Sequence, residues 1–126
     1  MNEDQKILIA EDDEFMLELL VQEMQKSGIK NISIVKTGKD IPAKVREEKP
    51  ALLLLDLILP DKNGLEALEE LRALPEGKDL RVIVLSNLSE PGYQTKAQEL
   101  GVVSYLVKSN MHLSEIVDSV KAALKK

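Results

Sequence analysis

Five short apolar runs recur along the chain, and the segments between them carry their apolar residues at helical spacing. The runs are about four to six residues long, as strands usually are, and occupy residues 7–10, 32–35, 51–55, 82–85 and 102–107. The segments between them predict amphipathic helices that cover a sheet. Because strands that alternate with helices are joined by right-handed crossovers, the pattern predicts a parallel sheet with helices on both faces. We therefore expect an α/β fold of the (βα)₅ type.

Three of the helical segments show their spacing most clearly. The apolar residues expected on their helical stripes are Phe15, Leu19, Leu20 and Met24 in the first, Leu65, Leu68 and Leu71 in the second, and Leu113, Ile116, Val117, Val120 and Leu124 in the last. Gly28 and Gly101 predict helix ends, since glycine readily adopts the left-handed conformation found there. Pro42 predicts a helix start, because its missing N–H is unpaired in a first turn anyway.

The composition limits the core and the size of the protein. Of the 126 residues, 44% are hydrophobic, and only Phe15, Tyr93 and Tyr105 are aromatic, so the core is expected to be aliphatic. The run at residues 51–55 is apolar at every position, which predicts the centre of a sheet covered on both faces. The length is typical of one domain, and we expect a single domain over residues 1–126 with no output domain.

Charge and cysteine content exclude several classes of protein. The net charge of −5 argues against nucleic-acid binding, which needs a concentrated Lys and Arg surface. With no cysteine, a disulfide framework, a thiolate metal site and a cysteine nucleophile are all excluded. No apolar run approaches the roughly 18 residues of a membrane span. We expect a soluble, cytoplasmic protein that binds neither nucleic acid nor membrane.

Candidate site residues follow four of the five apolar runs. In chain order they are Glu11-Asp12-Asp13, Asp56, Ser86 and Lys108. Ligands of open α/β sheets bind beyond the carboxyl ends of the strands, so we expect these acids, the hydroxyl and the ammonium to meet at one edge. Clustered carboxylates repel one another, and a bound cation relieves that repulsion. Hard oxygen ligands favour magnesium over zinc.

The chemistry of these side chains points toward a phosphoryl group. A carboxylate at the end of a buried strand, such as Asp56, is able to act as a nucleophile and form an aspartyl phosphate. A half-buried Lys108 needs an anion, either the acid cluster or a phosphoryl oxygen, and Ser86 has a hydroxyl to donate to the same oxygens. The alternative is structural: each acid caps the helix that follows it, and Ser86 is a turn or cap residue.

These residues, in this order and at these intervals, resemble the receiver domains of two-component response regulators over essentially the whole chain. The family has an acid pair after the first strand, Asp after the third, Thr or Ser after the fourth and Lys after the fifth. Residues 56–64 also resemble the family's D-x-x-x-P-x-x-x-G loop, in which Pro60 and Gly64 shape the turn into the third helix. The resemblance implies a flavodoxin-like, three-layer sandwich with a doubly wound parallel sheet of strand order 2-1-3-4-5.

The resemblance also implies a function, that of a phosphorylation-dependent signalling switch in a two-component system or phosphorelay. A phosphohistidine on a histidine kinase or a histidine phosphotransfer protein is expected to pass its phosphoryl group to Asp56. A downstream protein is expected to bind a face formed by the fourth helix, the fifth strand and the fifth helix. Such a chain is a signalling domain rather than an enzyme, apart from catalysing its own phosphorylation and dephosphorylation.

Site roles follow from the same resemblance, with Mg²⁺ as the expected cofactor and Mn²⁺ as a substitute. Glu11, Asp12 and Asp13 are each able to contribute to a metal pair, and the family register selects the first two. Asp12 and Asp56 are then expected to bind the metal directly, Glu11 through water, and Ile58 through its backbone carbonyl. Asp13 is expected to begin the first helix, where its charge suits the helix dipole.

The resemblance also assigns the residues that respond to phosphorylation. Ser86 and Lys108 are expected to contact the phosphoryl group, and Ser86 and Tyr105 to act as the switch pair. The alternative for Tyr105 is a half-buried strand residue with no role in switching.

Four positions depart from the commonest family pattern. Ser109 stands where proline usually follows the lysine, which predicts a more mobile loop. Asn87 replaces a small residue and is expected to narrow access to the phosphoryl group. Ile58 and Leu88 are apolar where polar residues are common, and we expect them to exclude water and slow autodephosphorylation. The only histidine, His112, is expected to be exposed or to cap the last helix rather than to donate phosphoryl or bind metal.

Two other functions use a similar set of residues. A phosphatase of the haloacid dehalogenase type also uses an Asp nucleophile with magnesium, but it needs a second Asp two residues on, where this chain has Ile58. A degenerate receiver that only binds partners would not need all the site residues that this chain retains. Phosphate-binding glycine motifs of dinucleotide or P-loop sites do not follow any of the runs.

Overall fold

The computed structural model describes residues 5–125, so the expected domain limits at residues 1 and 126 lie outside the described residues. Within this range, five strands form one parallel sheet in the order β2-β1-β3-β4-β5. Their bounds are β1 Ile7–Ala10, β2 Ile32–Val35, β3 Leu52–Leu55, β4 Arg81–Ser86 and β5 Ser104–Val107. The predicted (βα)₅ fold and strand order are confirmed, and the all-apolar strand β3 lies at the centre of the sheet.

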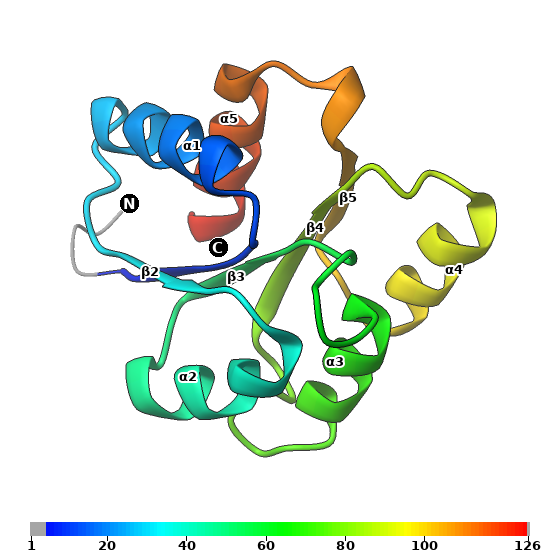
Figure 1. The fold of residues 1–126 in the computed structure, drawn as a ribbon. Helices are drawn as coiled ribbons and strands as arrows, with labels where there is room; N and C mark the ends of the chain where they lie inside the picture. The colour runs from blue at the N-terminus through cyan, green and yellow to red at the C-terminus, as the bar shows by residue number, and fades with distance from the viewer. Residues whose placement is uncertain (1–4, 126) are drawn as a thin grey trace.

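Among residues 5–125, five α-helices cover the sheet in two layers. They are α1 Glu14–Lys26, α2 Ile41–Glu48, α3 Gly64–Arg72, α4 Pro91–Glu99 and α5 Leu113–Leu124, and two short 3₁₀ turns occupy Gly38–Asp40 and Lys108–Asn110. Helices α1 and α5 lie on one face, and α2, α3 and α4 lie on the other (Figure 1). In the part of the chain that the structure describes, no helix is long and apolar enough to cross a membrane.

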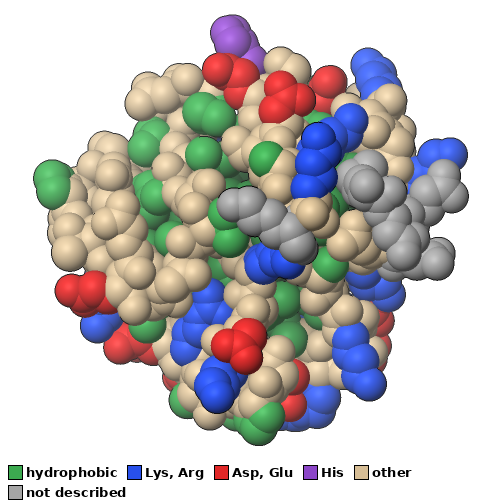
Figure 2. Space-filling model, turned by 180° about the vertical axis from the view of Figure 1, so that it is seen from behind, with side chains coloured by type: hydrophobic (Ala, Val, Ile, Leu, Met, Phe, Trp, Pro, Cys, Tyr) green, Lys and Arg blue, Asp and Glu red, His purple; other side chains and the backbone are tan. Residues whose placement is uncertain are grey.

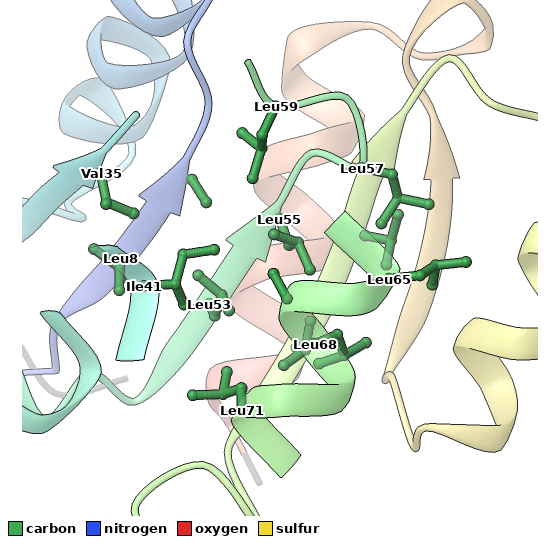
Figure 3. Packing of buried hydrophobic residues seen from close by; sticks show 14 of the residues in the cluster. Leu8, Val35, Ile41, Leu53, Leu55, Leu57, Leu59, Leu65, Leu68 and Leu71 are labelled. Carbon is green, nitrogen blue, oxygen red and sulfur yellow. The ribbon is translucent and has the colours of Figure 1, made fainter. Parts of the chain in front are cut away.

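Two aliphatic clusters hold the layers together, because neighbouring strand residues point to opposite faces of the sheet. In β3, Leu53 and Leu55 pack with α2, α3 and α4, whereas Leu52 and Leu54 pack with α1 and α5. Figure 3 shows the first cluster, in which the leucines of α3 lie beside those of β3. Burying one leucine side chain stabilises the folded state by about 1.5–3 kcal/mol. Because the leucines of β3 pack against both helix layers, the position of β3 and of its carboxyl end is fixed.

The predicted helix starts and ends are confirmed. Gly28 and Gly101 follow α1 and α4 with φ of +92° and +76°, the left-handed conformation expected after a helix. Pro42 occupies the first turn of α2. Asp13 caps α1, since its carboxylate accepts a hydrogen bond of 3.2 Å from the Met16 N–H.

The stripe predicted for the first helix is wrong at Phe15. The buried residues of α1 are Leu17, Leu20 and Met24, whereas 73% of the Phe15 side chain is exposed. Phe15 precedes Leu17 by two residues, or about 200° of helix rotation, and therefore points away from the sheet. The stripes predicted around residues 65–71 and 113–124 match the buried faces of α3 and α5, although Leu113 is only half-buried.

Strand bounds differ slightly from the apolar runs. β4 is longer than its run by one residue at each end, because Arg81 and Ser86 also join the ladder. β5 begins at Ser104 rather than at residue 102, because Val102 still belongs to the turn that follows α4, where its N–H donates to Ala97 O. The carboxyl ends of β1, β2, β3 and β5 lie where the runs predict them, and β4 ends one residue later, at Ser86.

Candidate functional site

The carboxyl ends of β1 and β3 bring two acids together. The last residues of these neighbouring strands, Ala10 and Leu55, are paired in the ladder, so the residues that follow, Glu11 and Asp56, leave the sheet side by side. The Asp56 N–H continues the ladder by donating to Ala10 O at 3.0 Å. Only 3% of Glu11 and 6% of Asp56 are exposed.

Lys108 lies against both acids. Its ammonium Nζ is 2.5 Å from Glu11 Oε1 and 2.9 Å from Asp56 Oδ2, and its side chain is itself mostly buried. Lys108 follows β5, which is separated from β3 by β4, so its extended side chain crosses the end of β4 to reach the acids. The ion pair predicted for Lys108 is confirmed.

Each buried carboxylate also accepts a hydrogen bond from the backbone. The second oxygen of Asp56, Oδ1, accepts from the Ile58 N–H at 3.0 Å, and Glu11 Oε2 accepts from the Asp13 N–H at 3.2 Å. Both acids are thus held by the lysine on one side and by a turn of the main chain on the other. This fixes the direction in which each carboxylate points.

The electrostatics of this cluster favour an additional positive charge. Burial raises the pKa of Glu11, an effect that the hydrogen bond from Lys108 opposes and that the charge of Asp56 reinforces. Burial alone would lower the pKa of Lys108, but the hydrogen bonds to Glu11 and Asp56 outweigh it and raise that pKa. Two carboxylates and one ammonium leave one negative charge uncompensated in a buried place, which suits a cation.

The donor set fits Mg²⁺ better than a metal that needs a closed protein cage. Among residues 5–125, no three acidic or histidine side chains are arranged to enclose a metal ion. Mg²⁺ keeps several waters and is usually held by one or two carboxylates plus phosphate oxygens, and Glu11 and Asp56 supply such a pair. Asp12, the next residue, is exposed at the same edge.

Ser86 and Tyr105 both contact the loop after β4. Ser86 is buried at the end of β4, and its Oγ accepts a hydrogen bond from the Leu88 N–H at 3.4 Å. The hydroxyl of Tyr105 donates to the carbonyl of Leu88. The two residues expected to act as a switch therefore converge on Leu88, one from each neighbouring strand.

Two departures from the family pattern, Asn87 and Ser109, are joined to each other. Asn87 Oδ1 accepts a hydrogen bond from the Ser109 N–H at 2.9 Å. The Asn87 side chain is therefore directed toward the loop after β5, and that loop has a tether that opposes the mobility predicted for it. Both residues stand out in the sequence as departures from the family pattern, but nothing in the sequence predicts their contact.

The loop between β3 and α3 is held by contacts that explain its glycine. A Cβ on Gly64 would lie 2.6 Å from Leu57 Cα and 2.8 Å from Asp56 O, so only glycine fits there, and the expected structural role of Gly64 is confirmed. The neighbouring Asp61 was not predicted to matter. Its carboxylate accepts hydrogen bonds from the N–H groups of Gly38 and Lys39 at 2.7 and 2.9 Å, which tethers this loop to the turn before α2.

His112 lies outside the site. It precedes α5, and its N–H donates to Glu115 Oε1 at 2.8 Å. Its side chain is exposed and projects at the top of the molecule in Figure 2, where it is drawn in purple. The expectation of an exposed position at the start of the last helix is confirmed.

Sequence comparison distinguishes a receiver domain from a phosphatase of the haloacid dehalogenase type. The family described as the response regulator receiver domain matches residues 7–121. The chain belongs to this family. Receiver domains of two-component systems are signalling domains that interact with histidine kinases and phosphotransfer proteins, and they generally bind Mg²⁺ at their acidic pocket. The haloacid dehalogenase alternative is therefore set aside.

Curated relatives of this receiver domain differ in how much of their length it spans. The chain is 32% identical over 125 residues to Sporulation initiation phosphotransferase F of Bacillus subtilis, covering 98% of this chain and 95% of that protein. It is 31% identical over 121 residues to the phosphate regulon transcriptional regulatory protein PhoB of Rhizobium meliloti, covering 96% of this chain but 52% of that protein. The chain thus spans about half the length of several relatives that it matches.

Solved structures share the receiver fold. The phosphorylated cyanobacterial phytochrome response regulator RcpA is 31% identical, with a TM-score of 0.79 over 94% of this chain and 89% of that one. A CheY-like receiver domain protein from Methanospirillum hungatei is 25% identical, with a TM-score of 0.86 over 96% of this chain and 94% of that one. Both TM-scores show that these structures share the fold of this chain.

Proposed function

We propose that this receiver domain works as a switch that accepts a phosphoryl group on Asp56. The observation that carries the proposal is the buried contact of the Lys108 ammonium with both Asp56 and Glu11. The Lys108 ammonium neutralises the charge of one of the two buried carboxylates. It has three N–H donors, so it is able to bind the oxygens of a phosphoryl group at the same place. The phosphotransferase named among the relatives supports a phosphoryl-transfer role.

In the proposed reaction, a carboxylate oxygen of Asp56 forms a bond to phosphorus as the bond from phosphorus to the donor histidine nitrogen breaks. The imidazole nitrogen keeps the electron pair, so no further reactant is needed. Asp56 is oriented for this attack by the Ile58 N–H on one oxygen and by Lys108 on the other. The protein's contribution is mainly alignment and charge stabilisation, as in other phosphoryl transfers.

We assign the metal to the same acids. Asp12 and Asp56 would bind Mg²⁺ directly, Glu11 would act through water, and the Ile58 carbonyl would complete the protein ligands, with Mn²⁺ as a substitute. The bound metal would neutralise part of the charge on the carboxylate and on the incoming phosphoryl group. The net negative charge of the buried cluster supports this assignment.

Ser86, Lys108 and Tyr105 would report the phosphorylated state. A phosphoryl group adds about −1.5 to −2 charges at pH 7, which draws the Lys108 ammonium and the Ser86 hydroxyl toward it. Ser86, the last residue of β4, accepts a hydrogen bond from the N–H of Leu88, and the carbonyl of Leu88 accepts one from Tyr105. A change at Ser86 would therefore pass to the α4–β5–α5 face, where β5 is an edge strand and a protein target has access.

The direct test is incubation with acetyl phosphate and Mg²⁺ followed by intact mass measurement. The wild-type chain should gain one phosphoryl mass, and Asp56→Asn should gain none. Asp79→Asn is the matched control and should behave as wild type, because Asp79 is an exposed acid just before the amino end of β4, away from the carboxyl ends of the strands. A wild-type chain that gains no mass would instead support a degenerate receiver that only binds partners.

A further inference from the structure

A side-chain hydrogen bond links the residues that directly follow Ser86 and Lys108 in the chain. The parallel ladder between β4 and β5 ends with the pair Ser86 and Val107. Beyond that pair the backbones separate, and the next connection is the hydrogen bond of 2.9 Å from the Ser109 N–H to Asn87 Oδ1. Asn87 thus extends the contact between the two strands past the end of the ladder.

The position of Ser109 makes this link relevant to Lys108. Lys108 begins the 3₁₀ turn Lys108–Asn110, which the Met111 N–H closes by donating to Lys108 O at 3.2 Å. Ser109 is the middle residue of this short turn, so a tether on its N–H restrains the backbone from which the Lys108 side chain departs. The ammonium at the other end of that side chain lies 2.9 Å from Asp56.

We propose that Asn87 is a positioning residue that holds the Lys108 turn against the strand end bearing Ser86. The proposal rests on the proposed function of Asp56. By fixing the Lys108 turn to the end of β4, the Asn87 amide keeps the lysine ammonium in place beside the acceptor carboxylate and at a constant spacing from Ser86. The hydrogen bond requires an N–H at residue 109, which proline lacks. Asn87 is therefore able to play this role only when residue 109 is not proline, as in this chain.

The opposite role for Asn87, that of narrowing access to the phosphoryl group, makes an opposite prediction. If the side chain obstructs the site, shortening it speeds phosphorylation of Asp56. If it positions Lys108, shortening it slows phosphorylation, because the ammonium is no longer held in place. The sign of the effect of Asn87→Ala separates the two roles.

The first measurement is hydrogen exchange of the Ser109 amide by NMR on the unphosphorylated full chain. Asn87→Ala should lose protection at Ser109, whereas Asn87→Asp, which keeps an acceptor oxygen in the same place, should retain it. Ser109→Ala keeps the backbone N–H and should also retain protection at residue 109. Equal exchange in wild type and Asn87→Ala would overturn the proposal without reference to any activity.

The second measurement is the rate of phosphorylation by acetyl phosphate in Mg²⁺, followed by intact mass. Asn87→Ala should be slower by about two- to tenfold, the range that loss of one neutral hydrogen bond produces. Ser109→Ala should match wild type. A wild-type rate or a faster rate in Asn87→Ala, or equal slowing in Ser109→Ala, would overturn the positioning role. A wild-type chain that takes up no phosphoryl group overturns the proposed function itself.

Discussion

The Lys108 ammonium lies 2.9 Å from the Asp56 carboxylate although their strands are not neighbours in the sheet. The lysine crosses the end of β4 and pairs with Glu11 as well. A buried ion pair of this kind adds little to the free energy of unfolding. Removing one partner lowers that free energy strongly, because the remaining charges stay buried without a partner. Lys108 should therefore matter for stability as well as for phosphorylation.

Replacing Lys108 with Met should destabilise the fold by about 2–3 kcal/mol, somewhat less than a fully buried pair because the lysine retains some solvent contact. The stabilisation by Lys108 should be complete below about pH 10.4, the usual lysine pKa, and be lost as the pH rises through the raised folded pKa. Urea unfolding across pH measures both. Equal stability of wild type and Lys108→Met at pH 7 would contradict the assigned ion pair.

Gly64→Ala should destabilise the chain by about 1–3 kcal/mol, because the added Cβ overlaps the backbone of Leu57 and Asp56. The control is Gly92→Ala in α4, where a Cβ meets nothing within 4 Å. That substitution should be neutral or stabilising by up to about 1 kcal/mol, because alanine is the better helix former. Thermal unfolding of both variants measures the contrast, and similar losses in the two would refute the tight approach at Gly64.

Asp61 should make stability depend on acid pH. The hydrogen bonds from the Gly38 and Lys39 N–H groups lower the pKa of this carboxyl. A depressed folded pKa contributes stability above the unfolded value, near 3.9, and that contribution is lost as the pH falls through the folded pKa. Asp61→Asn should therefore be less stable than wild type at pH 7, with the gap closing below about pH 4. A gap that is constant with pH would contradict the prediction.

Ile58 should lengthen the life of the phosphoryl group. Its side chain is 54% exposed two residues after Asp56, and we expect it to exclude water from the acyl phosphate. Ile58→Asn should shorten the phosphoryl lifetime several-fold in Mg²⁺ at neutral pH. The matched control is Val103→Asn, which should leave the lifetime unchanged. Val103 is an exposed apolar residue just before the amino end of β5, away from the carboxyl ends that carry the site. A wild-type lifetime of only seconds would count against slow autodephosphorylation.

Much of the fold was predictable from the sequence because periodicity and strand-end chemistry are local signals. The apolar run at β3 predicted the centre of the sheet, and the order of polar residues after the runs predicted that Asp56, Glu11 and Lys108 would meet. The prediction that Phe15 is buried was wrong because the leucine-rich sequence of α1 allows more than one apolar face. Packing against the sheet selects the face that carries Leu17, Leu20 and Met24.

Contacts between loops were not predictable, because they join residues far apart in the sequence with no periodic signal. Asn87 and Ser109 each stood out from the family pattern, but only the structure shows that they bind each other. Arg72 is a similar case: its guanidinium donates to carbonyl oxygens of Leu80 and Leu100 and so ties α3 to the turns before β4 and after α4. A charged residue on a helix gives no sign in the sequence that it acts as such a tether.

The most direct test of the switch is to locate the phosphoryl group after incubation with acetyl phosphate and Mg²⁺. Digestion at acid pH followed by peptide fragmentation identifies the modified residue. The predicted result is one phosphoryl group on Asp56, absent when the metal is chelated and absent in Asp56→Asn. A phosphoryl group on another residue such as Asp61, or equal uptake by Asp56→Asn, would contradict the account.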